Sequence, residues 1–192
     1  MRRKTRVNKL TSPELISQVL PENRELQTEF LEYLRNINRS PNTIAGYEND
    51  LDILFVWNLQ HNSNKPFREI TKRDLIRYQG WLINENENSS NRVRRLRSAI
   101  SSLSNYVENI IADEDEDYEG FRSIGRKIEA PPLEMVREKT VWSEEEVNAL
   151  LSTLMERQEY EKACYLALAV YSGRRKSELF RYKVEHFDKE NL

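Results

Sequence analysis

Apolar side chains recur at intervals of three and four residues along much of the chain, which predicts a succession of amphipathic α-helices. Four such stretches lie in the first 112 residues. Their apolar positions are Leu26, Phe30, Leu34 and Ile37; Ile44, Tyr47, Leu51, Leu54 and Phe55; Leu75, Tyr78 and Leu82; and Val93, Leu96, Ile100, Leu103 and Val107. Because a helix with one apolar stripe cannot bury that stripe alone, the pattern predicts a bundle of four helices.

Capping residues place the ends of these helices. The first is expected over residues 24–38, and the second begins with Ser40 as N-cap and Pro41 in the first turn. A polar stretch over 59–69 predicts a loop before the third helix, which Thr71 caps with Asp74 as an acidic capping-box partner. The fourth helix is expected to begin near Ser90.

The periodicity stops after Ala112, where an acidic run over 113–119 is followed by glycines and prolines that predict a linker over 113–139, with the acidic run as a solvated spacer. A second region over 140–192 begins with Ser143 and three glutamates, which is typical of a helix start. A more buried helix is expected over residues 160–172, a short helix over 176–182 and a candidate strand at 184–188. Residues 1–23 form a basic tail with a short helix near 13–19; a disordered start and a DNA-contacting arm both remain open.

The overall composition favours a helical protein, because the 192 residues include only 5 glycines and 6 prolines. A formal net charge of −2 argues against nucleic-acid binding when taken over the whole chain. The charges are clustered, however, and clusters decide binding more than averages do. The basic clusters are Arg2, Arg3, Lys4, Arg6 and Lys9 in the tail, and Arg92, Arg94, Arg95 and Arg97 in the fourth helix.

Cys164 is the one cysteine of the sequence, so an intrachain disulfide is excluded. It lies in an apolar run and is expected to be a small buried side chain in a protein from a reducing compartment. No apolar stretch reaches transmembrane length, and the first 20 residues lack the apolar core of a signal peptide.

Four segments, in this order, resemble the tyrosine recombinases, or phage integrases. Residues 40–47 read S-P-N-T-I-A-G-Y, similar to the T-x-x-x-Y helix of the family's core-binding domain. Residues 70–75 read I-T-K-R-D-L, and residues 94–100 read R-R-L-R-S-A-I, both similar to later helices of that domain. Residues 172–179 read S-G-R-R-K-S-E-L and resemble the family's T-G-L-R-x-x-E-L.

The resemblance implies a mainly α fold: a four-helix SAM-like core-binding bundle over residues 24–112, and over 140–192 the helical opening of a mixed α/β catalytic domain. It also implies DNA strand exchange through a 3′-phosphotyrosine, with no metal, no other cofactor and no small-molecule substrate. The implied partners are double-stranded DNA and further copies of the protein, as a tetramer on DNA. A prokaryotic, cytoplasmic and nucleoid-associated location follows, with no membrane partner.

Arg175 is the residue that the resemblance assigns to the active site, as a guanidinium that holds the phosphate, with Glu178 supporting it. The family usually has an apolar residue at the position of Arg174; aligning Gly173 and Glu178 selects Arg175. Neither His61 nor His186 stands where the family has its catalytic histidine. Its nucleophilic tyrosine has no counterpart up to Leu192, so the chain is expected to be an N-terminal fragment that binds DNA without cleaving it.

The fourth helix carries the DNA-binding argument, because four arginines fall within six residues with no acid among them. Arginines and small hydroxyl side chains at a helix start hold phosphates and reach a major groove. The expected DNA contacts are Asn42, Thr43, Arg92, Arg94, Arg95, Arg97 and Ser98.

Plainer interpretations stay open beside this one. The arginine run also fits a solvated charged face, and Arg175 also fits a surface salt bridge with a glutamate. Two other classes of protein remain: a DNA-binding module without catalysis, such as a regulator or an integrase remnant, and a helical protein–protein scaffold. A scaffold requires exposed apolar stripes in place of an arginine-lined helix.

Overall fold

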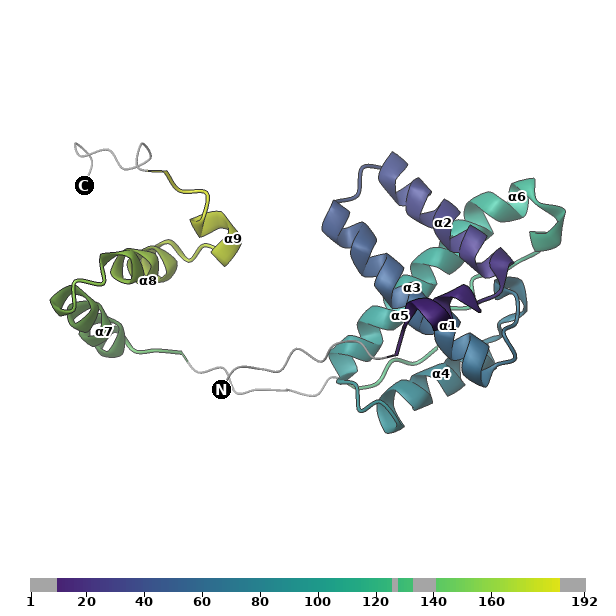
Figure 1. Ribbon diagram of the computed structural model, residues 1–192, viewed down its shortest axis with the longest axis horizontal. Coiled ribbons are helices and arrows are strands. Elements are labelled where there is room, and N and C mark those ends of the chain that lie inside the picture. Colours follow the sequence, from purple (N-terminus) through teal and green to yellow (C-terminus); the bar gives the residue numbers. More distant parts are fainter. Residues whose placement is uncertain (1–9, 126–127, 133–140, 184–192) are drawn as a thin grey trace. The chain divides into compact units, whose positions relative to one another are not determined.

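The computed structural model describes residues 10–125, 128–132 and 141–183, and the chain divides into two compact units, Met1–Val136 and Arg137–Leu192. The basic cluster at residues 2–9, the candidate strand at 184–188 and His186 lie outside the described residues. Within the described part every regular element is helical, which confirms the mainly α fold (Figure 1).

The described residues of the first unit form six α-helices and three short turns of other helix types. The α-helices are α1 (Pro13–Ser17), α2 (Pro21–Asn36), α3 (Pro41–His61), α4 (Lys72–Asn84), α5 (Ser90–Tyr106) and α6 (Ala112–Glu114). A π-helical turn, Val107–Ile111, joins α5 to α6, and 3₁₀ turns cover Phe67–Glu69 and Glu116–Tyr118. The four expected helices are therefore α2 to α5, and α3 continues three residues into the predicted loop.

Capping residues act at the expected positions. The Ser40 hydroxyl accepts a hydrogen bond from the Thr43 backbone N–H at 3.2 Å, with Pro41 in the first turn. Thr71 and Asp74 form a reciprocal capping box, with bonds of 3.2 Å and 2.9 Å. Each such cap stabilises a helix start by about 1 kcal/mol, because it satisfies backbone donors that have no partner within the helix.

Helix α3 lies at the centre of the first unit and contacts α1, α2 and α5. A single apolar stripe was expected on it, but residues 53–58 are buried on every side, since Ile53, Val56 and Trp57 are covered as well as Leu54. A helix that is apolar all round belongs in the interior. Ile37, predicted to be part of the first stripe, instead caps the end of α2 and is exposed.

The segment that follows α6 packs back onto the bundle. The acidic side chains of residues 113–119 are exposed, as a solvated run should be, but Tyr118 and Ile124 are buried in the core and Phe121 and Ile128 lie against it. The expected linker over 113–139 is therefore part of the first unit for much of its described length. Its apolar residues are too widely spaced to give the periodicity that marks a helix.

The described part of the second unit contains α7 (Glu144–Glu156), α8 (Tyr160–Ser172) and α9 (Lys176–Leu179). Ser143 and Glu146 form the predicted helix start as a capping box, and Gly173 ends α8 in the left-handed conformation, with φ 61°. Glycine takes this conformation without the steric penalty of a side chain.

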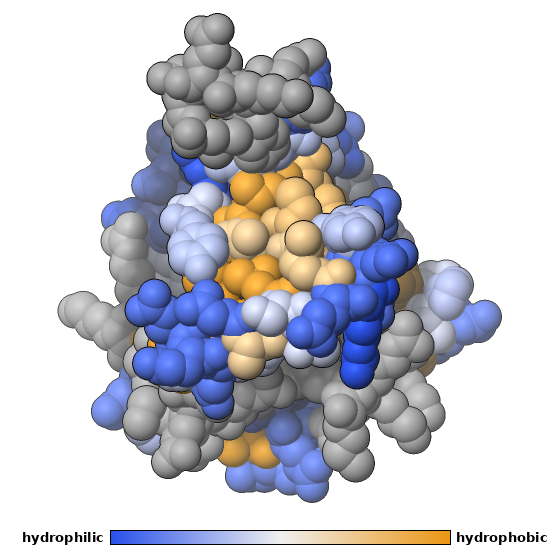
Figure 2. Space-filling view, turned by 90° about the vertical axis from the view of Figure 1, so that its left-hand side faces the viewer, coloured by the Kyte–Doolittle hydropathy of each residue, from blue (hydrophilic) through white to orange (hydrophobic). Residues whose placement is uncertain are grey.

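The expectation of a buried α8 with a buried Cys164 is wrong. Only Ala163 of α8 is fully buried, and Cys164 is exposed together with Val170 and Tyr171. Among the described residues α8 packs chiefly against α7 and α9, and these two neighbours leave much of its surface open. Figure 2 shows apolar side chains gathered on one face of this unit.

The core assignment gives a direct stability test. Leu103→Ala removes a side chain of α5 that is fully buried, and this should lower the free energy of unfolding by about 2–5 kcal/mol. Ile76→Ala, at an exposed position of α4, is the matched control and should change it by less than about 0.5 kcal/mol. Urea denaturation followed by circular dichroism measures both. Equal effects of the two substitutions would contradict the core described here.

Candidate nucleic-acid interface

The four arginines of α5 divide into two pairs that contact different parts of the first unit. Residues three apart on a helix lie on the same side of it, which pairs Arg92 with Arg95 and Arg94 with Arg97. The first pair binds Asp50 of α3, and the second pair binds backbone carbonyls of residues 128–131. All four guanidinium groups thus have partners within the protein.

Asp50 is buried between α3 and α5 with a side chain only 3 % exposed. Arg92 donates from Nη1 to Oδ1 at 2.7 Å, and Arg95 donates from Nε to Oδ2 at 3.0 Å. A buried carboxylate needs such partners, because the loss of its hydration is otherwise uncompensated. Two arginines on one carboxylate leave this cluster with a net charge of +1.

Arg95 is the more exposed member of this pair, with a side chain 62 % exposed against 29 % for Arg92. Its guanidinium lies against the backbone of α3 at Gly46, where an added Cβ would sit 2.7 Å from Nη2. Any larger residue at position 46 would displace the end of the arginine. Gly46 and Asp50 together therefore fix where Arg95 presents its charge.

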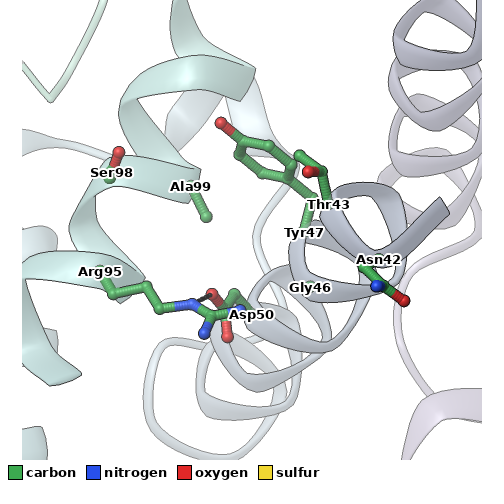
Figure 3. Close-up of a pocket in the computed structure, with 8 residues that line it drawn as sticks. All are labelled: Asn42, Thr43, Gly46, Tyr47, Asp50, Arg95, Ser98 and Ala99. Carbon is green, nitrogen blue, oxygen red and sulfur yellow. Dashed lines mark hydrogen bonds and ion pairs between the residues drawn. The ribbon is translucent and has the colours of Figure 1, made fainter. Parts of the chain in front are cut away.

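A pocket of about 340 Å³ opens between the start of α3 and the first half of α5 (Figure 3). Its lining consists of Asn42, Thr43, Gly46, Tyr47, Asp50, Arg95, Ser98 and Ala99. Four of the seven residues expected to contact DNA meet here: Asn42, Thr43, Arg95 and Ser98. Backbone N–H groups in the first turn of a helix point outward and carry partial positive charge, so the start of α3 adds to the charge of Arg95.

The other three expected DNA contacts do not line this pocket. Arg92 is turned to Asp50. Arg94 donates from Nε and Nη2 to the Pro131 carbonyl at 3.1 Å and 2.7 Å, and Arg97 donates from Nη2 to the Ile128 carbonyl. Burial, together with the neighbouring Arg94, lowers the pKa of Arg97.

A second and larger hollow of the first unit, about 950 Å³, has the opposite charge. Its acidic lining comes from α2, α6 and the turn after α6: Glu22, Glu25, Glu29, Glu114, Asp115, Glu116 and Asp117. Tyr106, at the end of α5 far from the arginines, and Ile111, in the π-helical turn that follows, also line it. Phosphates are repelled from such a surface, which leaves the arginine end of α5 as the candidate interface.

Comparison with known proteins gives the family. Residues 26–113 match the family model described as phage integrase, N-terminal SAM-like domain. The chain is 34 % identical over 171 residues to the SPbeta prophage-derived recombinase-like protein YomM of Bacillus subtilis (strain 168), an alignment that covers 89 % of this chain and 50 % of that protein. Residues 26–113 therefore form a domain of the phage integrase N-terminal SAM-like family, and the chain as a whole is similar to a recombinase-like protein. It spans about half the length of this curated relative, and no solved structure matched it.

The recombinase motif at residues 172–179 lies at the end of α8 and in α9. Arg175 is the residue before α9, and its side chain is 86 % exposed. Its backbone N–H donates to Glu178 Oε2 at 3.0 Å, and its Nη1 donates to Oε1 at 3.3 Å. Glu178 thus contacts both the backbone and the guanidinium of Arg175. An exposed ion pair of this kind contributes less than about 1 kcal/mol, so the arginine can exchange the carboxylate for a phosphate at little cost.

Arg174, the neighbour that departs from the recombinase pattern, is placed differently from Arg175. It lines a hollow of about 220 Å³ together with Glu178, Arg181 and Tyr182, whereas Arg175 does not. The role assigned to Arg175 rests on the motif, and it stays a prediction.

Sequence reasoning missed Asp50 and Gly46. Asp50 stands between two other acids of α3, Glu48 and Asp52, and nothing in the sequence distinguishes it or indicates its partners, which lie 42 and 45 residues further along the chain. No described helix is long and apolar enough to cross a bilayer, and no group of three or more potential metal ligands occurs among the described residues.

The role of Asp50 can be measured without DNA. Asp50→Asn removes the charge that neutralises Arg92 and Arg95, and it should lower the free energy of unfolding by about 1.5–3 kcal/mol, the usual contribution of hydrogen bonds to a charged group. Asp113→Asn, on the exposed acidic run, should stay within about 0.5 kcal/mol of the unchanged protein. Chemical denaturation measures both, and an Asp50 variant as stable as the Asp113 variant would refute the buried cluster.

Proposed function

We propose that this chain is the DNA-binding part of a site-specific recombinase and that its bundle holds duplex DNA on the face formed by the start of α3 and the first half of α5. The observation that carries the proposal is the pocket at which Asn42, Thr43, Arg95 and Ser98 meet. The family membership makes DNA the expected ligand of this face.

The chemistry of the pocket suits a backbone phosphate. Arg95 is held at one side by Asp50 through Nε, and its charge cannot be lost near neutral pH. The amide and hydroxyl groups of Asn42, Thr43 and Ser98 are further donors, and the positive end of the α3 dipole favours an anion. Contacts of this kind fix the register of a protein on a duplex and do not read its sequence.

The reaction proposed for the whole protein is a transesterification. A tyrosine hydroxyl attacks a DNA phosphodiester, forms a 3′-phosphotyrosine and expels a 5′-hydroxyl, which later attacks that link to rejoin a strand. The energy of the broken bond is kept in the protein–DNA link, so ATP is not required. Arg175 is proposed to donate hydrogen bonds to the non-bridging oxygens, where negative charge gathers in the transition state.

A DNA-binding module without catalysis is the second candidate, because the family motif supplies one active-site arginine among the residues of this chain and no counterpart of the nucleophile. On either candidate the 192 residues alone should bind duplex DNA without forming a covalent adduct. Whether a longer protein that contains them forms one separates the two candidates.

Arg95 gives the test of the binding face. Arg95→Ala should weaken duplex binding at low salt and reduce the slope of log K against log salt by about 1, because one phosphate contact is lost. Arg73→Ala, which removes an exposed arginine of α4 outside the pocket, is the control of equal charge. Fluorescence anisotropy with a labelled duplex measures both. Equal losses in the two variants would show that total charge matters and the pocket does not.

Arg175 and its neighbour give the test of the catalytic assignment. In a protein that carries this chain together with the family's nucleophilic tyrosine, Arg175→Ala should reduce formation of the covalent adduct by about 10²–10³-fold, by analogy with the loss of one oxyanion donor. Arg174→Ala should retain most of the adduct. Gel analysis of protein–DNA adducts gives both rates, and the reverse order would transfer the role to Arg174.

A further inference from the structure

The two arginine pairs of α5 differ in how their charge is neutralised. Arg92 and Arg95 share the carboxylate of Asp50. Arg94 and Arg97 bind only neutral backbone carbonyls, and no carboxylate forms an ion pair with either of them among the residues that the structure describes. The second pair therefore keeps two positive charges side by side on one helix.

Residues 128–132, which we call the strap, cover this second pair. Arg94 holds the Pro131 carbonyl through two nitrogens, Arg97 holds the Ile128 carbonyl, and the side-chain amide of Gln79 on α4 donates to the Glu129 carbonyl at 3.3 Å. In each of these bonds the strap contributes an acceptor and a side chain of the bundle contributes the donor. Ile128 adds a partly buried apolar contact.

The chain just before the strap is attached far more closely. Ser123 and Ile124 are buried, and Gly125 lies so close to α5 that an added Cβ would sit 2.4 Å from the Ser101 hydroxyl and 3.1 Å from its Cα. Among the described residues Gly125 is thus the last closely packed position before the strap, and the strap itself is held chiefly by the two arginines.

The arginine pair beneath the strap lacks its best partners. Like charges at this spacing repel each other, and Nη1 of Arg97 is buried with no hydrogen-bond partner among the residues that the structure describes. Burial and the positive charge of Arg94 both lower the pKa of Arg97, as expected for a cation that no carboxylate in the described part of the chain neutralises. A phosphate carries the negative charge that a backbone carbonyl lacks, and it accepts two parallel hydrogen bonds from one guanidinium, so it is a better partner for each arginine than the carbonyl.

The position of the pair puts it within reach of DNA held on the pocket. Ser98, which lines the pocket, is three residues from Arg95 and four from Arg94, and both spacings make neighbours on a helix surface. A duplex that contacts Ser98 and Arg95 therefore runs alongside Arg94 and the edge of the strap.

We propose that DNA phosphates displace the strap from Arg94 and Arg97, so that DNA binding changes the residue at which the chain leaves the bundle from Pro131 to Gly125. This inference rests on the proposed function, since it requires a duplex on the arginine face of α5. The strap lies close to the boundary between the two units at Val136 and Arg137. When DNA releases the strap, the segment of chain that connects the bundle to the second unit becomes longer.

Distances between spin labels test the proposal on the whole chain. Cys164→Ser removes the native thiol, and one label pair is placed at Lys72→Cys on α4 and Glu129→Cys on the strap, both exposed positions. The control pair uses Lys72→Cys with Glu119→Cys, which lies in the anchored segment before Gly125. Double electron–electron resonance is recorded with and without a saturating duplex of mixed sequence, and duplex binding is measured on the same samples by anisotropy.

The strap pair should give a narrow distance distribution without DNA and lose that narrow peak when the duplex binds, while the control pair stays narrow. Arg94→Ala with Arg97→Ala should lose the narrow peak even without DNA. Arg94→Lys with Arg97→Lys keeps both charges but cannot donate paired bonds in one plane, so it should bind the duplex with the strap already released.

Other outcomes overturn the proposal. Duplex binding with an unchanged strap distance would refute displacement and leave the proposed DNA-binding function intact. A narrow strap distance in the Arg94→Ala, Arg97→Ala variant without DNA would refute the conclusion that these two arginines hold the strap in place. Failure of the unsubstituted chain to bind any duplex would refute the proposed function and the displacement together.

Discussion

Asp50 places a carboxylate inside the contact between α3 and α5, and much of the first unit depends on how that charge is compensated. Its two partners, Arg92 and Arg95, come from the helix that also carries the apolar residues Val93 and Leu96 into the core. The ion cluster therefore determines which side of α5 faces α3. The apolar residues determine how closely α5 packs against the core. Removing one member of a buried ion cluster destabilises a protein by more than the whole cluster stabilises it. The cluster therefore favours one packing of α5 on α3 even where its net contribution to stability is small.

The same cluster links packing to function. Arg95 could swing freely if it were an isolated surface arginine, and a flexible side chain loses entropy when it binds a phosphate. Asp50 accepts a hydrogen bond from Nε of Arg95, and Gly46 leaves room for the guanidinium to lie against α3. Part of the side-chain entropy of Arg95 is therefore already lost on folding, before any ligand binds. The pocket at the start of α3 is thus a preorganised surface, and its geometry depends on the buried carboxylate of Asp50.

The sequence predicted most of the bundle, because its signals are local. Thr71 with Asp74, Ser40 with Pro41, and the apolar series from Val93 to Val107 are all contained within a few turns of helix. The features that escaped prediction depend on distant contacts. Asp50 meets arginines from another helix, the strap meets Arg94 and Arg97 across more than 30 residues, and Tyr118 reaches the core from an acidic run. The burial of Cys164 was predicted wrongly for a related reason. Apolar neighbours in the sequence do not show which other elements cover a side chain.

The distribution of charge along α5 has a kinetic consequence. The arginines occupy the first half of the helix, and the acidic hollow with Glu25, Glu29 and Glu114 lies beyond its end. A bundle charged in this way behaves as an electric dipole whose positive end, reinforced by the backbone dipole of α5, turns toward a polyanion before contact. Most encounters with a duplex would then begin in the productive orientation, despite a net charge of −2 for the chain. Added salt should slow association more than it speeds dissociation, because it screens the field that orients the approach.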